Sequence, residues 1–157
     1  MADLDRIDLA ILRVLQEDAR LPNAQLADRV GLSPSPCLRR VKRLQQLGLI
    51  RGFATLLEPR SVGLGVNVFV SVTLNDQARP ELEQFEAQVR ECPEVMECYL
   101  MTGDFDYLLR VVATDLDAYQ HFLIEKLTRI PGVANIKSSF ALKQVIQRHA
   151  LPLAHLS

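Results

Sequence analysis

The chain has 157 residues, of which 48% are hydrophobic and 24% charged, with a formal net charge of −1. This composition is ordinary for a soluble protein and supplies enough apolar residues for a core. No apolar run approaches the roughly 20 residues that a membrane-spanning helix needs, so we expect no membrane partner.

Charge is distributed unevenly along the chain. Up to Arg60 there are ten Lys and Arg residues against seven Asp and Glu, and from Ser61 onward eight against twelve. A basic first part and an acidic second part suggest two modules with different partners. Gly63 and Gly65 mark the natural boundary, so we expect one domain at residues 1–60 and another at residues 61–157.

Three short helices are predicted in the first part. Residues 5–18 carry apolar side chains at i, i+3, i+4 and i+7, the pattern of an amphipathic helix. Asn23 is expected to cap a second helix that ends at Gly31, and Ser33 to cap a third that begins with Pro34. Two short helices joined by a tight turn form a helix-turn-helix, whose second helix enters the major groove of double-stranded DNA.

The third predicted helix has an apolar side and a basic side. At about 100° per residue, Leu38, Val41 and Leu44 gather on one side, while the basic residues lie opposite or on the flanks. No acidic residue occurs between Asp28 and Glu58. A solvated surface helix is the alternative for any single arginine, but five basic residues after a proline-capped start favour DNA binding.

Separate roles are expected for the residues of this helix. Arg pairs most naturally with the acceptors of guanine, whereas hydroxyl and flanking basic groups contact phosphates and set orientation. Cys37 falls close to the apolar stripe and is expected to pack in the core. We therefore expect Pro36, Arg39 and Arg43 at base edges, and Ser33, Ser35, Arg40 and Lys42 at phosphates.

Residues 52–57 read as a short strand that ends at Glu58-Pro59. An isolated strand needs a partner to be stable. We expect this strand to pair with its copy in another subunit.

The second part alternates strands and helices. Strands are predicted at 66–74, 95–102, 107–114 and 133–146, and helices at 80–91 and 116–130. The order β-α-β-β-α-β, with a Pro-x-Val echo at Pro93 and Pro131, predicts a ferredoxin-like fold with both helices on one face of the sheet. The fold class is therefore α+β, a helix-turn-helix domain followed by a ferredoxin-like domain.

The other face of this sheet is expected to be too apolar to stay wet, because valines, Phe69, Tyr99 and Met101 are assigned to it. Dimerisation through this face explains the pattern. It also suits DNA recognition, since a dimer can present two helix-turn-helix units about 34 Å apart to a symmetric site.

Several motifs carry a family resemblance. Residues 4–8 read Leu-Asp-Arg-Ile-Asp, residues 29–38 read Arg-Val-Gly-Leu-Ser-Pro-Ser-Pro-Cys-Leu, and residues 103–107 read Gly-Asp-Phe-Asp-Tyr. Pro131-Gly132-Val133, near the start of the last predicted strand, belongs to the same set of motifs. In these motifs and their order the chain resembles the Lrp/AsnC, or feast/famine, transcriptional regulators along nearly its full length. Residues 94–102 are similar to regulators of branched-chain amino or keto acid catabolism.

The resemblance implies a winged-type helix-turn-helix domain joined to a ligand-binding domain of ferredoxin-like fold. It implies dimers that assemble into larger rings, such as an octamer, around which DNA can bend. It also implies that a free amino acid, branched-chain or otherwise apolar, binds between dimers at the Gly-Asp-x-Asp loop and alters assembly or DNA affinity.

The chemistry of that loop suits an amino acid. Carboxylates can hold the ammonium group, and backbone N–H groups near a glycine can hold the carboxylate. A plain hairpin turn is the alternative reading of Gly-Asp. The predicted effector site takes its acids from Asp104 and Asp106, its other polar groups from Thr102, Gly103, Ser138 and Ser139, and its apolar wall from Leu100 and Met101.

Catalysis is not expected. His121, His149 and His155 are scattered without metal-site spacing, and neither a Cys-x-x-Cys motif nor a phosphate-binding glycine loop occurs. We predict no catalytic residue, no metal and no cofactor. Three cysteines without a pairing pattern fit a reducing compartment, so we expect a cytoplasmic protein. The alternative function is an architectural, nucleoid-type protein that wraps DNA without a small-molecule effector.

Overall fold

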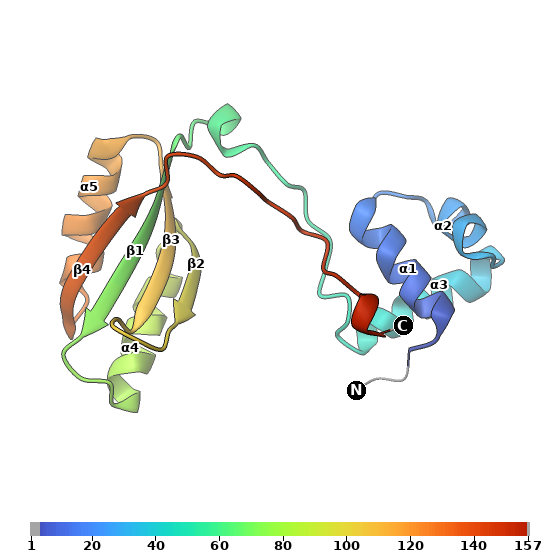
Figure 1. Cartoon of the computed structure of the whole chain (residues 1–157), viewed down its shortest axis with the longest axis horizontal. Helices are drawn as coiled ribbons and strands as arrows, with labels where there is room; N and C mark the ends of the chain where they lie inside the picture. Colours follow the sequence, from blue (N-terminus) through green and yellow to red (C-terminus); the bar gives the residue numbers. More distant parts are fainter. Residues whose placement is uncertain (1–3, 157) are drawn as a thin grey trace. The chain divides into compact units, whose positions relative to one another are not determined.

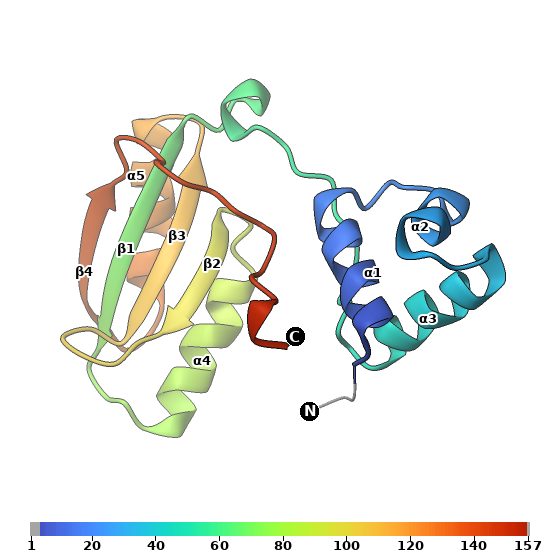
Figure 2. The same ribbon diagram turned by 45° about the vertical axis from the view of Figure 1, so that its right-hand side comes forward.

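The computed structural model describes residues 4–156, which form two compact units (Figure 1). One unit extends to Thr55 and also takes in the chain from Val145 onward, and the other spans Leu56–Gln144. Figure 2 shows each unit from a second side. The expected domain boundary after residue 60 stays a prediction.

Three helices build the first unit: α1 (Arg6–Glu17), α2 (Asn23–Val30) and α3 (Pro34–Gln46). α1 begins with a capping box, in which Asp5 accepts from the N–H groups of Ile7 and Asp8, and the Asp8 side chain accepts from the Asp5 N–H. This exchange satisfies donors that the first turn leaves unpaired. One face of each helix closes over a small core that contains Ile11, Leu26, Ala27, Cys37 and Leu44.

The start of α2 differs from the prediction. Its cap position is Pro22, which makes no side-chain capping bond, and Asn23 is already helical. The Asn23 side-chain amide instead donates to the carbonyl of Pro34 at 2.8 Å, which ties the start of α2 to the start of α3. Gly31 ends α2 in the left-handed conformation, as expected.

Residues 52–57 do not form a strand in the single chain. Phe53, Leu56 and Leu57 are exposed there. A strand is stable only when a neighbour satisfies its backbone groups, and residues 4–156 of the single chain form no ladder with this segment. Pairing with a second copy stays a prediction.

The second unit has the predicted order β1 (Val66–Leu74), α4 (Arg79–Arg90), β2 (Val95–Leu100), β3 (Tyr107–Ala113), α5 (Leu116–Glu125) and β4 (Val133–Phe140). The four strands pair in the order β2-β3-β1-β4, and every pair is antiparallel. Both helices cover the same face of the sheet (Figures 1 and 2). This arrangement confirms the ferredoxin-like prediction.

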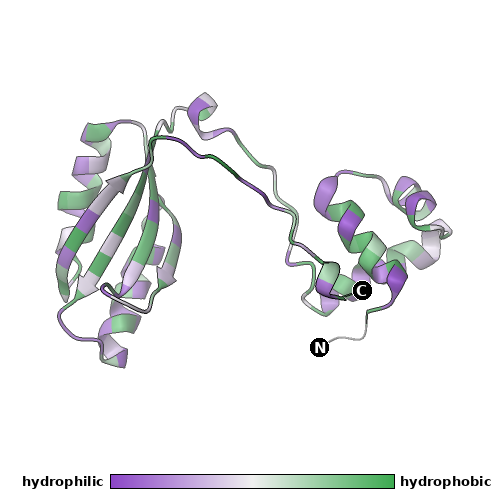
Figure 3. Ribbon diagram, viewed as in Figure 1, coloured by the Kyte–Doolittle hydropathy of each residue, from purple (hydrophilic) through white to green (hydrophobic). Residues whose placement is uncertain are grey.

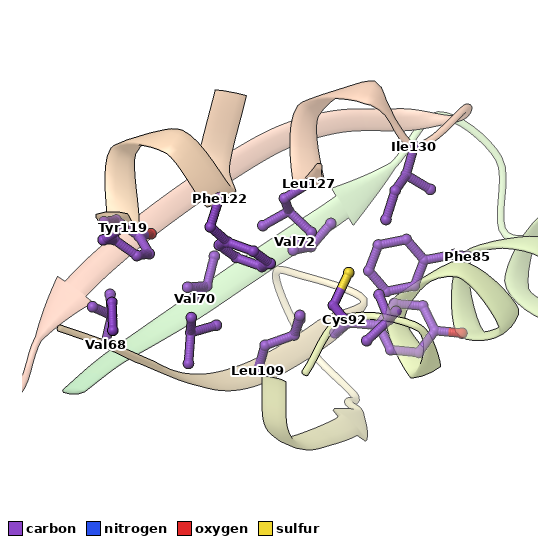
Figure 4. Close-up of a cluster of buried hydrophobic side chains, with 14 of the residues drawn as sticks. Val68, Val70, Val72, Phe85, Cys92, Leu109, Tyr119, Phe122, Leu127 and Ile130 are labelled. Atoms are coloured by element: carbon purple, nitrogen blue, oxygen red, sulfur yellow. The ribbon is translucent and has the colours of Figure 1, made fainter. Parts of the chain in front are cut away.

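The core of the second unit lies between the sheet and its helices (Figure 4). Val68, Val70 and Val72 of β1 are fully buried there, against Phe122 of α5 and Leu127. Figure 3 shows the apolar residues that the strands contribute. The expectation that valines leave the open face apolar is therefore wrong for these three, because period two turns them toward the helices.

Two elements, α5 and β4, end well before their predicted bounds. α5 ends at Glu125 and is followed by a 3₁₀ turn at Leu127–Arg129, and the φ of −118° at the junction residue Lys126 is far from the α-helical value of about −63°. β4 ends at Phe140 rather than near residue 146, and Phe140 pairs with Val68 near the start of its partner strand β1. Beyond it, both backbone groups of Leu151 bond to the side-chain amide of Gln16 on α1.

Candidate functional site

The sequence around α3 sets where the helix begins and ends. Ser33 occupies the cap position but makes no side-chain capping bond, so that part of the prediction is wrong. Pro34 follows at the first helical position. At the other end, Gly48 has a φ of 72°, its N–H donates to Gln45 and the Leu49 N–H donates to Leu44. These bonds form a Schellman motif that satisfies the last carbonyls of the helix.

The buried face of α3 is rotated relative to the predicted one. Cys37 and Leu44 are completely buried, whereas Leu38 is 43% exposed. Burial raises the pKa of the Cys37 thiol, in keeping with the expected packing role. The rotation carries Arg40 and Arg43 toward α1.

An ion-pair cluster joins α3 to α1. Arg40 Nη1 lies 2.7 Å from Asp5 Oδ2 and 2.8 Å from Asp8 Oδ1, and Arg43 Nη1 lies 3.0 Å from Asp8 Oδ2. The Asp8 side chain is only 2% exposed, while those of Arg40 and Arg43 remain 30% and 48% exposed. The four side chains line a pocket of about 380 Å³.

The cluster favours the charged forms of Asp5 and Arg40. The hydrogen bond that the Asp5 carboxylate accepts from the Asp8 backbone N–H lowers the pKa of Asp5, and the bond from the Arg40 side chain lowers it further. The Asp8 and Asp5 carboxylates raise the pKa of Arg40. Asp5 and Asp8 were not among the predicted site residues, although an acid at the cap and another three residues later is a recognisable helix-start signal.

The remaining predicted DNA contacts lie on or beside α3 and reach solvent. Arg39 and Lys42 are exposed and make no ion pair within residues 4–156. Ser33 and Ser35 are exposed at the start of the helix, and Pro36 is half-buried.

The predicted effector loop connects β2 to β3. The Met101 N–H donates to the Asp106 carbonyl at 2.8 Å, which closes the loop. Gly103 has a φ of 119°, a conformation that other residues rarely adopt. Thr102, Gly103 and Asp104 are exposed at the tip, so their polar groups are open to a ligand.

Asp106 has a different environment from Asp104. It is 6% exposed, and its Oδ2 and Oδ1 accept from the Leu74 N–H and from Gln77 Nε2, each at 2.7 Å. Its own N–H donates to the Val72 carbonyl. The carboxylate thus ties the hairpin to the end of β1.

Leu100 and Met101 are exposed beside the loop. Leu100 also lines a pocket of about 210 Å³ between α4 and the sheet, together with Cys98 and Tyr107. The Tyr107 hydroxyl donates to Glu86 Oε1 at 2.9 Å, and burial with this bond raises its pKa well above the usual range.

The structure does not bring Ser138 and Ser139 to the loop of the same chain. Both lie on β4, at the opposite edge of the sheet from β2. Ser138 shares a hydrogen bond of 2.5 Å with the Tyr119 hydroxyl of α5, so it faces the helices. Ser139 is exposed beside Phe69.

Residues 4–156 contain neither a metal-binding cluster nor a helix suited to span a membrane. That part of the chain holds no group of three or more His, Cys, Asp or Glu residues placed to bind a metal. None of its helices combines the length and apolar character required to span a membrane.

Comparison with known proteins gives consistent matches for both units. Residues 4–51 match the winged helix-turn-helix DNA-binding family, and residues 67–151 match the Lrp/AsnC ligand binding domain. The chain is 53% identical over 153 residues to the Bkd operon transcriptional regulator of Pseudomonas aeruginosa, covering 98% of this chain and 100% of the relative. It is 46% identical over 149 residues to the leucine-responsive regulatory protein of Escherichia coli, covering 95% and 91%. The structure of a Neisseria meningitidis transcriptional regulator in complex with L-Met superposes with a TM-score of 0.93 at 46% identity, covering 99% and 100%.

Proposed function

Because the chain belongs to the Lrp/AsnC family of transcriptional regulators, we propose that it binds DNA through α3 and that a free amino acid controls this binding or the assembly behind it. The sequence predicts a regulator rather than an enzyme, and this prediction agrees with the family and with the relatives, which are transcriptional regulators. The observation that carries the effector proposal is the likeness, over 99% of the chain, to a regulator crystallised with L-Met.

α3 is the proposed reading helix. Arg39 stands at its centre, and Ser33, Ser35 and Lys42 provide phosphate contacts around it. Arg40, Arg43 and Pro36 complete the surface at its flank. A titration with duplex DNA at several salt concentrations tests this assignment, because each phosphate contact adds about 0.9 to the salt slope. Specific affinity that is unchanged in Arg39→Ala would overturn it.

The exposed tip of the β2–β3 loop is the proposed effector site. Asp104 offers a carboxylate for the ammonium group, and the backbone around Gly103 and the Thr102 hydroxyl offer donors for the carboxylate. Leu100 and Met101 offer an apolar wall, which suits a branched-chain or other apolar side chain. We assign Asp106 to shaping this loop, and Ser138 and Ser139 can contribute only from elsewhere in an assembly.

Calorimetry with a panel of free amino acids tests the effector site. We expect an apolar amino acid to bind the wild type and to bind Asp104→Ala more weakly. If no amino acid binds the wild type, the architectural DNA-wrapping function becomes the better account. If Asp104→Ala binds as well as the wild type, the site lies elsewhere.

We further propose a homodimer that assembles into a larger ring, with an octamer as the expected size. The open face of the sheet supports an interface, because Phe69 and Tyr99 are exposed on it beside the ion pair of Glu97 and Arg110. A mass measurement with and without the amino acid tests the assembly. Since chromosomal DNA and free amino acids meet in the cytoplasm, we propose that location.

A further inference from the structure

Asp8 is an unusual acid for a DNA-binding unit. Within residues 4–156, Asp8 and Asp106 are the charged residues with near-complete burial. Asp106 secures a hairpin, but Asp8 directs its carboxylate at two arginines of the proposed reading helix. A buried charge is costly unless it is paired, so this arrangement is held firmly in place.

The two arginines occupy one side of α3, a single turn apart, and Asp8 reaches them with different oxygens. Oδ1 lies 2.8 Å from Arg40 Nη1, and Oδ2 lies 3.0 Å from Arg43 Nη1. Because one rigid carboxylate contacts both, it fixes the two guanidinium groups relative to each other before DNA arrives. Fixing long side chains in advance reduces the entropy lost when they bind.

The cluster also cancels charge where DNA is expected. Asp5 and Asp8 balance Arg40 and Arg43, so four of the charges at the junction of α1 and α3 sum to zero. Sequence-independent affinity comes from positive charges that neutralise phosphates. A guanidinium that already has a carboxylate partner adds less to that attraction, while its planar donors still give direction.

We propose that Asp8 is a positioning residue that sets the specificity of DNA binding. It orients Arg40 and Arg43 and weakens their attraction for phosphates, so that binding to arbitrary DNA is suppressed relative to binding at a preferred site. This inference rests on the proposed function, in which α3 faces DNA.

The variant Asp8→Asn tests the proposal, with Glu17→Gln as its control. Each removes one negative charge from α1, but Glu17 is exposed at the far end of the helix and makes no ion pair in the described chain. The probes are a random-sequence duplex and a duplex pool enriched by selection with the wild-type chain.

On random DNA we expect Asp8→Asn to bind more tightly, with a salt slope steeper by about one per bound subunit, as one added phosphate contact predicts. Its preference for the enriched pool should fall. Glu17→Gln should keep the wild-type slope and preference. Equal slopes for Asp8→Asn and the wild type, or the same steepening in Glu17→Gln, would overturn the proposal.

Two further variants separate this role from a purely structural one. Asp8→Glu keeps the charge and should retain a slope near that of the wild type. The double variant Asp8→Asn/Arg43→Gln restores the charge balance and should return the slope toward the wild-type value. Circular dichroism establishes whether each variant is folded. If Asp8→Asn does not fold, the preference of Asp8→Glu for the enriched pool is the deciding measurement, and we expect it to be lower than that of the wild type. A preference fully equal to the wild type in Asp8→Glu would then contradict a role in orienting the arginines, since the longer side chain displaces them.

The proposal and the function fail in different ways. If the wild type binds neither duplex, the proposed function is wrong. If the wild type binds both but the variants share its slope and preference, only the role of Asp8 is wrong.

Discussion

Replacing Asp106 by Ala should destabilise the second unit without touching the exposed tip of the loop. The carboxylate accepts two hydrogen bonds of 2.7 Å, from the Leu74 N–H and from Gln77 Nε2. Each bond to a charged group contributes about 1.5–3 kcal/mol, and the buried Leu74 N–H would lose its partner. We therefore expect a loss of about 3 kcal/mol in the free energy of unfolding.

Tyrosine fluorescence measures this loss selectively. The chain has no tryptophan, and its three tyrosines, Tyr99, Tyr107 and Tyr119, all lie in the second unit. A urea dependence of about 2 kcal/mol per molar converts the expected loss into a midpoint lower by about 1.5 M. Asp104→Ala is the matched control, because Asp104 is exposed two residues away, and its midpoint should stay at the wild-type value. An unchanged midpoint in Asp106→Ala, or an equal loss in Asp104→Ala, would refute the assignment of Asp106 to loop shape.

The loop, the open sheet face and α3 can each be probed by a single substitution. Gly103→Ala places a side chain at a φ of 119° and should lower the stability of the same unit by about 1–3 kcal/mol, seen as an earlier tyrosine transition. Hydrogen bonds from the Tyr99 hydroxyl and from Arg110 lower the pKa of Glu97. Because the folded pKa of Glu97 lies below its unfolded value, ionised Glu97 stabilises the fold above pH 4.5, and this stabilisation is lost as the pH falls through the folded pKa. Urea midpoints measured from pH 7 to pH 3 should therefore fall less steeply in Glu97→Gln, and parallel profiles would contradict this. Lys42→Ala removes a proposed phosphate contact and should reduce the salt slope of DNA binding by about 1 per bound subunit. Arg13→Ala, on the exposed side of α1, should leave the slope unchanged.

The order of elements was predictable from sequence, because hydrophobic periodicity and the Gly and Pro residues at element boundaries are local features of the chain. The alternation of residues 66–74 matches β1 residue for residue, and Gly31 and Pro34 mark the turn between α2 and α3. The side of each element that faces the core was harder to predict than the order of the elements. Leu38 was predicted on the buried side of α3 with Val41 and Leu44 but is 43% exposed, because several positions around the helix were apolar and only packing selects among them.

The candidate site shows the same division. That the β2–β3 loop is exposed follows from its turn residues, but the different roles of Asp104 and Asp106 do not. Burial of Asp106 depends on Leu74 and Gln77, about 30 residues away in the chain. Likewise the partners of Arg40 and Arg43 come from α1, and no local pattern in α3 indicates them. The predicted strand at residues 52–57 needs a partner strand, and the pairing with a second copy of the chain that we expect there stays a prediction.

We propose above all that an amino acid bound in the second unit changes DNA binding by the first. The most direct measurement is the binding isotherm of the wild type on the enriched duplex pool, with and without saturating Leu, Ile, Val or Met. Coupling between sites is usually worth about 1–3 kcal/mol, so at least one amino acid should shift the midpoint by about fivefold or more. The shift should be smaller in Asp104→Ala. Superimposable isotherms for the wild type with every amino acid would contradict the claim and leave a DNA-binding protein without this control.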